Sequence, residues 1–184
     1  MTVLLETSRL LLRLATQQDI PHLLDYFHAN ADFHRPFEPI RPEGWLTVAF
    51  WRSQVLKNFR QFQQGQALRL FLFDRADNRT VVGMANFTQF YGYPFHACSL
   101  GYGLAETAQG QGLMQEALEA GIRYVFTEMH CHRIMASYMP SNQRSAKLLQ
   151  RLGFQIEGSA KDYLLINGQW QDHILTSLIN PAWA

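Results

Sequence analysis

The chain has 184 residues, of which 47% are hydrophobic and 17% charged, with a formal net charge of +1 at pH 7. This balance is typical of one globular domain with a substantial core and excludes an intrinsically disordered chain. The small net charge argues against general binding to nucleic acid or membrane surfaces, and no stretch approaches the ~20 apolar residues that a membrane span needs.

The first predicted elements are a short strand and a helix. Residues 9–14 form an apolar run of strand length. Thr16 is a good helix N-cap, Asp19 stands at the capping-box position, and Pro21 suits a first helical turn. We therefore expect a helix from Thr16 to about Ala29.

Residues 33–42 form an aromatic, proline-rich segment. Pro36, Pro39 and Pro42 each remove a main-chain donor and fix φ, so no regular structure is predicted there. A second helix is expected over residues 44–64.

The middle of the chain predicts three antiparallel strands joined by turns. Apolar residues are concentrated in segments 68–73, 81–90 and 96–104. The residues between these segments are rich in Asp, Asn, Gly and Pro, which favour turns. We expect the three strands to be adjacent in one sheet.

The most informative motif follows the third of these strands. Residues 109–114 read Gln-Gly-Gln-Gly-Leu-Met and precede a predicted amphipathic helix over residues 116–129. Glycines at a strand-to-helix turn let main-chain N–H groups approach an anion, and the helix dipole adds partial positive charge there. The motif suits a pyrophosphate site, but a plain turn explains the same glycines.

The last third of the chain predicts a strand, a helix and a hairpin. The strand covers residues 133–138 and the helix covers residues 142–152. An Asn-Gly pair between the apolar runs 163–166 and 170–178 is a strong hairpin signal. The complete order of elements predicts a mixed α/β (α+β) fold with a mostly antiparallel central sheet.

Two phrases in this order resemble the GCN5-related N-acetyltransferases (GNAT), a superfamily whose fold binds acetyl-CoA. The first is Gln109-x-x-Gly112, after a strand and before a helix, and the second is the Asn-Gln-Arg-Ser sequence of residues 142–145. The superfamily pattern has Gly or Ala where this chain has Met114, a departure expected to crowd the turn slightly. The resemblance implies one GNAT domain over residues 1–184, with a splayed strand pair and helices on both faces of the sheet.

Further phrases are similar to the GNAT branch that acetylates the N-termini of ribosomal proteins. They lie in residues 6–13, 112–114, 132–136, 161–166 and 168–173. This resemblance implies that acetyl passes from acetyl-CoA to the N-terminal alanine α-amine of an S5-type ribosomal protein, by direct attack in a ternary complex. It implies no metal, no direct nucleic-acid partner and no membrane partner. The presence of only two cysteines favours a reducing cytoplasm.

The same resemblance places coenzyme A along two segments. Main-chain amides of the glycine-rich turn are implied to hold the pyrophosphate, and the pantetheine arm to add to the edge of the preceding strand. The implied contacts are Tyr102, Gly103, Leu104, Gln109, Gly110, Gln111, Gly112, Leu113, Met114, Gln115, Asn142 and Ser145. Alternatively, Gly101 and Gly103 form a β-bulge, which would itself splay the strand.

Asn142 and Ser145 are the candidate catalytic residues. They stand one helical turn apart, so both can face one cleft, although helix capping also explains Asn142. Many relatives have a tyrosine acid where this chain has Leu149, so Ser145 becomes the first candidate to protonate the leaving thiolate, with water as the alternative. The glutamate of one relative corresponds to Ser137, so no general base is named.

The acceptor side is predicted from residues 33–42, which lie where this fold places its substrate-facing loop, although such a segment can also be a rigid connector. Phe37, Glu38 and Asp162 are the candidate substrate-binding residues. Glu38 suits a cationic peptide, and Asp162 suits the substrate amine. Other acceptors stay open: another protein N-terminus, or a small amine such as a polyamine or an antibiotic. A CoA-binding ribosome-assembly factor without turnover is the alternative of a different class.

Overall fold

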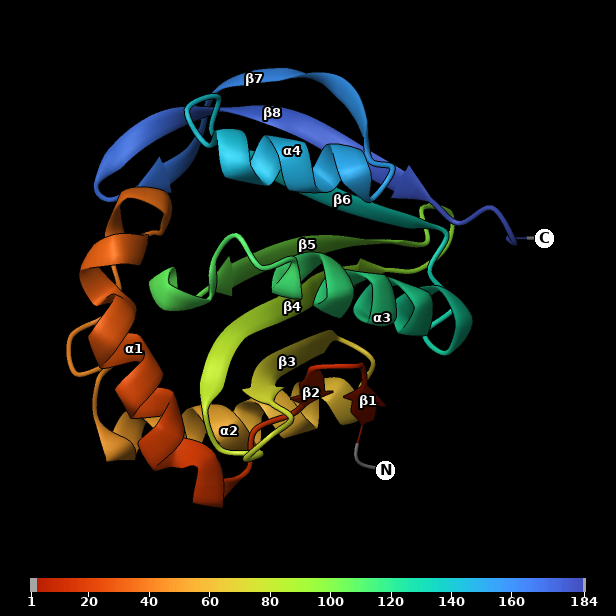
Figure 1. Ribbon diagram of the computed structural model, residues 1–184. Helices are drawn as coiled ribbons and strands as arrows, with labels where there is room; N and C mark the ends of the chain where they lie inside the picture. Colours follow the sequence, from red (N-terminus) through yellow and green to blue (C-terminus); the bar gives the residue numbers. More distant parts are fainter. Residues whose placement is uncertain (1–2, 184) are drawn as a thin grey trace.

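The computed structural model describes residues 3–183, which form an eight-stranded sheet and four α-helices (Figure 1). The strand order is β1-β2-β3-β4-β5-β6-β8-β7, and each neighbouring pair is antiparallel except β5 and β6. The strands are β1 (Leu4–Glu6), β2 (Leu10–Arg13), β3 (Ala67–Asp74), β4 (Val81–Tyr91), β5 (Ala97–Leu104), β6 (Arg133–Tyr138), β7 (Gln155–Ile166) and β8 (Gln169–Ile179). The helices are α1 (Ile20–His34), α2 (Val48–Gln63), α3 (Leu113–Thr127) and α4 (Gln143–Arg151). The predicted mixed, mostly antiparallel fold is confirmed.

Helices cover both faces of the sheet. Successive side chains of β3 point to opposite faces, and the side chains on each face meet a different helix. The ring of Phe71 packs against Trp51 of α2, with ring centroids 6.0 Å apart. Leu70 faces α3 instead. A Cβ at Gly121 of α3 would lie 3.9 Å from Leu70 and only 3.0 Å from the Phe87 ring of β4. Glycine at this position therefore lets α3 approach the sheet closely, on the side of the sheet opposite α2 (Figure 1).

The first helical segment begins where the sequence predicts, but it ends later than predicted. The Asp19 carboxylate accepts hydrogen bonds from the main-chain N–H and the hydroxyl of Thr16, both at 2.7 Å. Helix α1 continues to His34, and a 3-10 turn follows over Arg35–Phe37. The prediction of irregular structure over residues 33–42 was wrong for residues 33–37 and is confirmed for residues 38–42. Pro36 lies at the start of the 3-10 turn, where a missing N–H leaves no hydrogen bond unmade.

Other element ends also differ from expectation. Helix α2 begins at Val48 rather than residue 44, because the Thr47 hydroxyl caps it by accepting from the Phe50 N–H at 3.3 Å. The sequence does not predict β1 or the first eight residues of β7. Residues 155–162 are mostly polar and exposed, so their strand conformation depends on pairing with β8 rather than on a local pattern. Within residues 3–183, no helix is both long and apolar enough to cross a membrane.

The sheet opens between β5 and β6, as the GNAT resemblance implies. These strands pair only where residues 97–99 meet residues 133–135, and they diverge beyond that point. The β-bulge considered for Gly101 and Gly103 is absent, because both glycines pair with β4 in regular register. The register shift between β4 and β5 lies at residues 88–91 instead. The opening therefore arises on the β6 side of β5.

Candidate active site

The glycine-rich turn, residues 109–114, connects β5 to α3 and presents a row of main-chain donors. Gly110 and Gly112 have φ angles of +75° and +76°, a left-handed conformation that other residues adopt only at a cost. In the described part of the chain, no N–H from residue 110 to residue 114 donates to another main-chain group. Gly112 is the N-cap of α3 and supplies no capping side chain. Free N–H groups at a helix N-terminus attract anions, so the turn fits a diphosphate.

The two apolar side chains of the turn point into the protein. Leu113 and Met114 belong to the hydrophobic core, and the Met114 side chain is only 6% exposed. The expected crowding by Met114 therefore does not occur, because its side chain packs beneath the turn while its N–H remains at the helix start.

The three glutamines predicted to touch the coenzyme have different surroundings. Gln109 is extended, and its N–H donates to the Glu106 carbonyl at 3.3 Å. The Gln111 side chain donates to the Thr107 carbonyl at 3.2 Å. The Gln115 side chain bridges α3 to α4 by accepting from Arg151 at 3.0 Å. The side chains of Gln111 and Gln115 are therefore already hydrogen-bonded within the protein.

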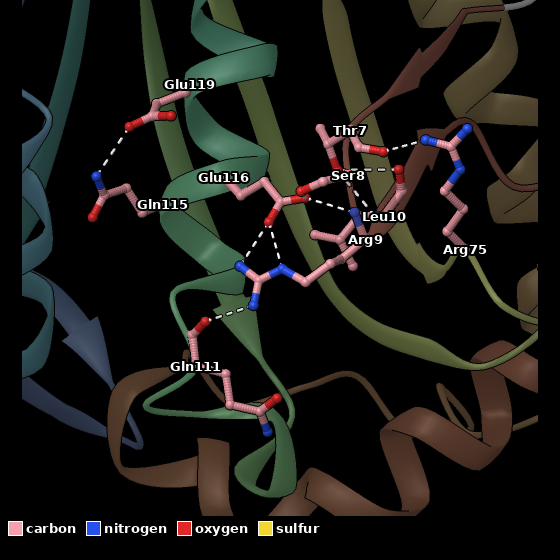
Figure 2. A network of polar contacts seen from close by, with 9 residues as sticks. All are labelled: Thr7, Ser8, Arg9, Leu10, Arg75, Gln111, Gln115, Glu116 and Glu119. Atoms are coloured by element: carbon pink, nitrogen blue, oxygen red, sulfur yellow. Dashed lines mark hydrogen bonds and ion pairs between the residues drawn. The ribbon is translucent and has the colours of Figure 1, made fainter.

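A charged network that the sequence does not signal ties the N-terminal segment to this turn (Figure 2). The Arg9 guanidinium donates to the Glu116 carboxylate, in the first turn of α3, at 2.7 and 2.6 Å. It also donates to the main-chain carbonyl of Gln111 at 2.8 Å. The other Glu116 oxygen accepts from the Ser8 hydroxyl at 2.9 Å and the Arg9 N–H at 2.8 Å. Arg9 and Glu116 are 107 positions apart, so only the fold brings them together.

The Glu116 carboxyl group is expected to make the stability of the folded protein depend on pH. Burial alone would raise the pKa of its carboxyl group, but hydrogen bonds from Thr7, Arg9 and Ser8 lower the pKa from 4.5 to about 2. The folded protein therefore holds this proton less tightly than the unfolded chain does. The resulting contribution to stability is complete above pH 4.5 and is lost as the pH falls toward 2.

We expect Glu116→Gln to have a lower free energy of unfolding than the wild type at pH 7, because glutamine cannot form the ion pair with Arg9. This difference should shrink as the pH is lowered from about 4.5 to about 2, where the wild-type carboxylate is also being protonated. Urea unfolding followed by circular dichroism at several pH values measures it. A difference that stays constant over this range would contradict the assignment.

The opening between β5 and β6 is bordered by a hydrogen-bonded pair of hydroxyl groups. The Tyr102 Oη of β5 lies 2.7 Å from the Ser145 Oγ of α4. Burial raises the pKa of the Tyr102 hydroxyl to about 12. The hydrogen bond with Ser145 lowers this pKa, and the nearby Tyr138 raises it. The Tyr102 hydroxyl therefore stays protonated at neutral pH. The structure thus joins two predicted site residues that lie 43 positions apart.

Asn142 is the N-cap of α4, where its side-chain oxygen accepts from the Ser145 N–H at 3.1 Å. Asn142 therefore does cap α4. The bond occupies the amide oxygen and fixes Ser145 in the first turn of the helix. The same contact holds the Ser145 hydroxyl facing Tyr102 across the opening.

Helix α1 supplies two residues on the other face of β5 that the sequence does not single out. His34 Nε2 donates to the Leu104 carbonyl at 2.9 Å. The Tyr26 hydroxyl is buried without a hydrogen-bond partner in the described residues, and it lies 3.7 Å from where a Cβ of Gly103 would be. Burial raises the pKa of Tyr26, and the Glu38 charge adds to this effect. These side chains join α1 to the splayed end of β5.

The predicted acceptor residues do not form one cluster of direct contacts. Phe37 is 44% exposed. The Glu38 carboxylate pairs with Arg41 at 2.7 Å, and its main-chain carbonyl accepts from the Asn167 N–H at 2.9 Å, which ties the proline-rich segment to the β7–β8 turn. Asp162 lies where the register of β7 shifts, and its N–H donates to Asp172 at 2.9 Å. Glu38 is therefore already paired with a cation.

Comparisons with known proteins agree with this architecture. Residues 9–155 match the Acetyltransferase (GNAT) domain family. The chain is 48% identical over 181 residues to the [Ribosomal protein uS5]-alanine N-acetyltransferase of Escherichia coli, covering 98% of this chain and 93% of the relative. The crystal structure of the ribosomal-protein-S5-alanine acetyltransferase from Vibrio fischeri matches with a TM-score of 0.94 and 36% identity, over 99% of both chains. RimJ of Mycobacterium smegmatis in complex with CoA-disulfide matches with a TM-score of 0.86 and 25% identity, over 97% of this chain and 86% of that one.

Proposed function

This chain belongs to the GNAT acetyltransferase family, and from that premise we propose that it acetylates the N-terminal alanine α-amine of an S5-type ribosomal protein. Acetyl-CoA is the proposed donor, and the domain is proposed to cover residues 1–184. The observation that carries the proposal is the 48% identity, over nearly the whole chain, to the E. coli enzyme named for this reaction. The cytoplasm, where ribosomal proteins are made, is the proposed location.

The proposed coenzyme site uses the donors described above. The free N–H groups of residues 110–114 would hold the diphosphate at the start of α3. The unpaired edge of β5, along Tyr102, Gly103 and Leu104, would hold the pantetheine arm as an added strand. Bound acetyl-CoA supplies an activated thioester, and these residues orient it beside Ser145.

Ser145 is the proposed proton donor to the leaving thiolate. If the Tyr102 hydroxyl donates to Ser145 Oγ, the hydrogen of Ser145 is free to point at the sulfur. The amine nitrogen forms a bond to the acetyl carbon, the carbon–sulfur bond breaks, and the Ser145 proton passes to sulfur. Tyr102 then returns a proton to Ser145 and regains its own from water. Asn142 positions Ser145 in this scheme.

An α-amine acceptor needs only modest base catalysis. Its reference pKa is near ~8, so roughly a tenth is neutral at pH 7, whereas a lysine amine near ~10.4 is almost wholly protonated. A water molecule can therefore accept the amine proton. Phe37, Glu38 and Asp162 remain the proposed acceptor contacts. Because Glu38 is already paired with Arg41, we propose that it acts together with that arginine rather than as a free carboxylate.

A peptide assay tests the proposed function. We incubate the protein with acetyl-CoA and a peptide that has an S5 N-terminal sequence, beginning with alanine and containing an internal lysine. Fragmentation mass spectrometry is expected to show one acetyl group on the α-amine. A matched peptide with a blocked N-terminus should stay unmodified.

Two other results would overturn the proposal. Modification confined to internal lysines, or to small amines in a panel read by thiol release, would assign a different acceptor. Binding of coenzyme A without thiol release on any amine would indicate a non-catalytic CoA-binding protein.

A further inference from the structure

One peptide unit of the glycine-rich turn has an unusual freedom. The unit between Gln111 and Gly112 rotates about ψ of Gln111 and φ of Gly112, and the left-handed Gly112 has no Cβ to hinder rotation on its side. A trans peptide is planar, and its C=O and N–H point in opposite directions. The direction of the Gln111 carbonyl therefore sets the direction of the Gly112 N–H.

Arg9 fixes this peptide unit from outside the turn. Its Nη1 donates to the Gln111 carbonyl at 2.8 Å, while its Nε and Nη2 hold the Glu116 carboxylate (Figure 2). A guanidinium is a rigid planar fork, so anchoring two of its nitrogens on Glu116 also orients the third. Glu116 belongs to α3, so the fork connects the turn to the helix that follows it.

We propose that Arg9 is a positioning residue for coenzyme binding, because it locks the Gln111–Gly112 peptide so that the Gly112 N–H points toward the anion. This inference rests on the proposed function, since it assumes that the turn binds the diphosphate of coenzyme A. Arg9 acts through the main chain and does not itself need to touch the coenzyme. The N-terminal segment thus contributes to a site formed more than one hundred positions later in the chain.

A simpler electrostatic role for Arg9 is also testable. Glu116 places a negative charge in the first turn of the helix whose start would bind an anion, and Arg9 neutralises that charge. If neutralisation were the whole role, removing both charges in Arg9→Gln/Glu116→Gln would restore affinity. If the Gln111 carbonyl must be held, the double variant stays weak.

Arg75 offers a matched control. Both arginine side chains are 48% exposed and both contact the N-terminal segment. The Arg75 side chain donates to the Thr7 carbonyl and pairs with Glu6, and no hydrogen bond or ion pair joins it to the turn within residues 3–183. Replacing either arginine by glutamine removes one surface charge, but only Arg9 loses the hydrogen bond to Gln111.

The experiment compares wild type, Arg9→Gln, Arg9→Lys, Arg75→Gln and the double variant by calorimetry with coenzyme A and by steady-state kinetics. We expect Arg9→Gln to weaken coenzyme binding about tenfold, as for loss of one hydrogen bond to a charged group. The KM for acetyl-CoA should rise equally, while kcat at saturation and the KM for peptide stay near wild type. Arg9→Lys should not rescue, because a lysine ammonium is a point charge on a flexible stem and lacks the planar fork that orients the donor to Gln111. Arg75→Gln should bind normally.

Each contrary result has a separate meaning. Wild-type protein that ignores coenzyme A would remove the proposed function itself. Wild-type binding with normal affinity in Arg9→Gln would overturn the positioning role alone. Recovery in the double variant, or an equal loss in Arg75→Gln, would replace positioning by simple electrostatics. Thermal melting of each variant verifies that the protein tested is folded.

Discussion

Replacing Gly112 by valine is expected to abolish measurable coenzyme A binding, with a loss of at least about 100-fold. A β-branched residue at a φ of +76° is strained by more than ~1–2 kcal/mol, so the turn must change conformation. That change redirects the N–H groups at the start of α3, and each lost hydrogen bond to a charged group costs about 1.5–3 kcal/mol. Two such losses correspond to about 100-fold or more in affinity. Isothermal calorimetry with coenzyme A measures the effect.

Gly65→Val is the matched control for this strain. Gly65 follows α2 with a φ of +67°, and a Cβ there would meet nothing within 4 Å. The backbone cost is therefore similar, but residue 65 lies outside the glycine-rich turn. We expect comparable losses in melting temperature in the two variants, with normal coenzyme affinity in Gly65→Val. Normal affinity in folded Gly112→Val would remove the diphosphate assignment.

Ser145→Ala is expected to lower kcat by about 100-fold, the lower range for loss of a general acid. The KM for acetyl-CoA should change little, because the main-chain donors of the glycine-rich turn are untouched. The variant keeps the Asn142 cap, since that bond uses the Ser145 N–H rather than its hydroxyl. Thiol release at saturating substrate, measured across neutral pH, gives the comparison.

Tyr102→Phe tests the role of the tyrosine hydroxyl separately from that of the Ser145 hydroxyl. It retains the aromatic ring but removes the partner of the Ser145 hydroxyl. We expect a smaller loss in kcat, about tenfold, because Ser145 can still donate while its orientation is less restricted. If kcat were unchanged in both variants, water would be the proton donor, and the hydroxyl pair would serve only the packing of α4 against β5.

Local patterns in the sequence predict much of the fold. The strands around residues 68–104 alternate with clear turns, and the Asn-Gly pair at residues 167–168 marks a real hairpin. Thr16 and Asp19 mark the start of the first helical segment. These features depend on residues close together in sequence, so a local pattern is sufficient to find them.

Most of the failed predictions share one physical cause, which is dependence on residues that are distant in the sequence. Residues 155–162 of β7 are mostly polar and form a strand only beside β8. Pro36 is a local exception: it does not prevent regular structure as expected, because it lies in the 3-10 turn that directly follows α1. Neither the Arg9–Glu116 pair nor the Tyr102–Ser145 pair has a local signal, since each joins elements that meet only in the folded sheet. The roles of the individual site residues remain predictions.

The short pairing of β5 with β6 has a mechanical consequence. The main-chain bonds that join the N-terminal strands to the C-terminal strands all lie at one end of the β5–β6 boundary, in the part of the chain that the structure describes. Each side of that boundary is otherwise a continuous antiparallel unit. A tilt of the two units about this short hinge would also strain the bonds that join them elsewhere, from the Asn167 N–H to the Glu38 carbonyl at 2.9 Å and from Arg151 to Gln115 at 3.0 Å. A small tilt widens or narrows the distant end of the gap, where Tyr102 faces Ser145, without separating any paired strands.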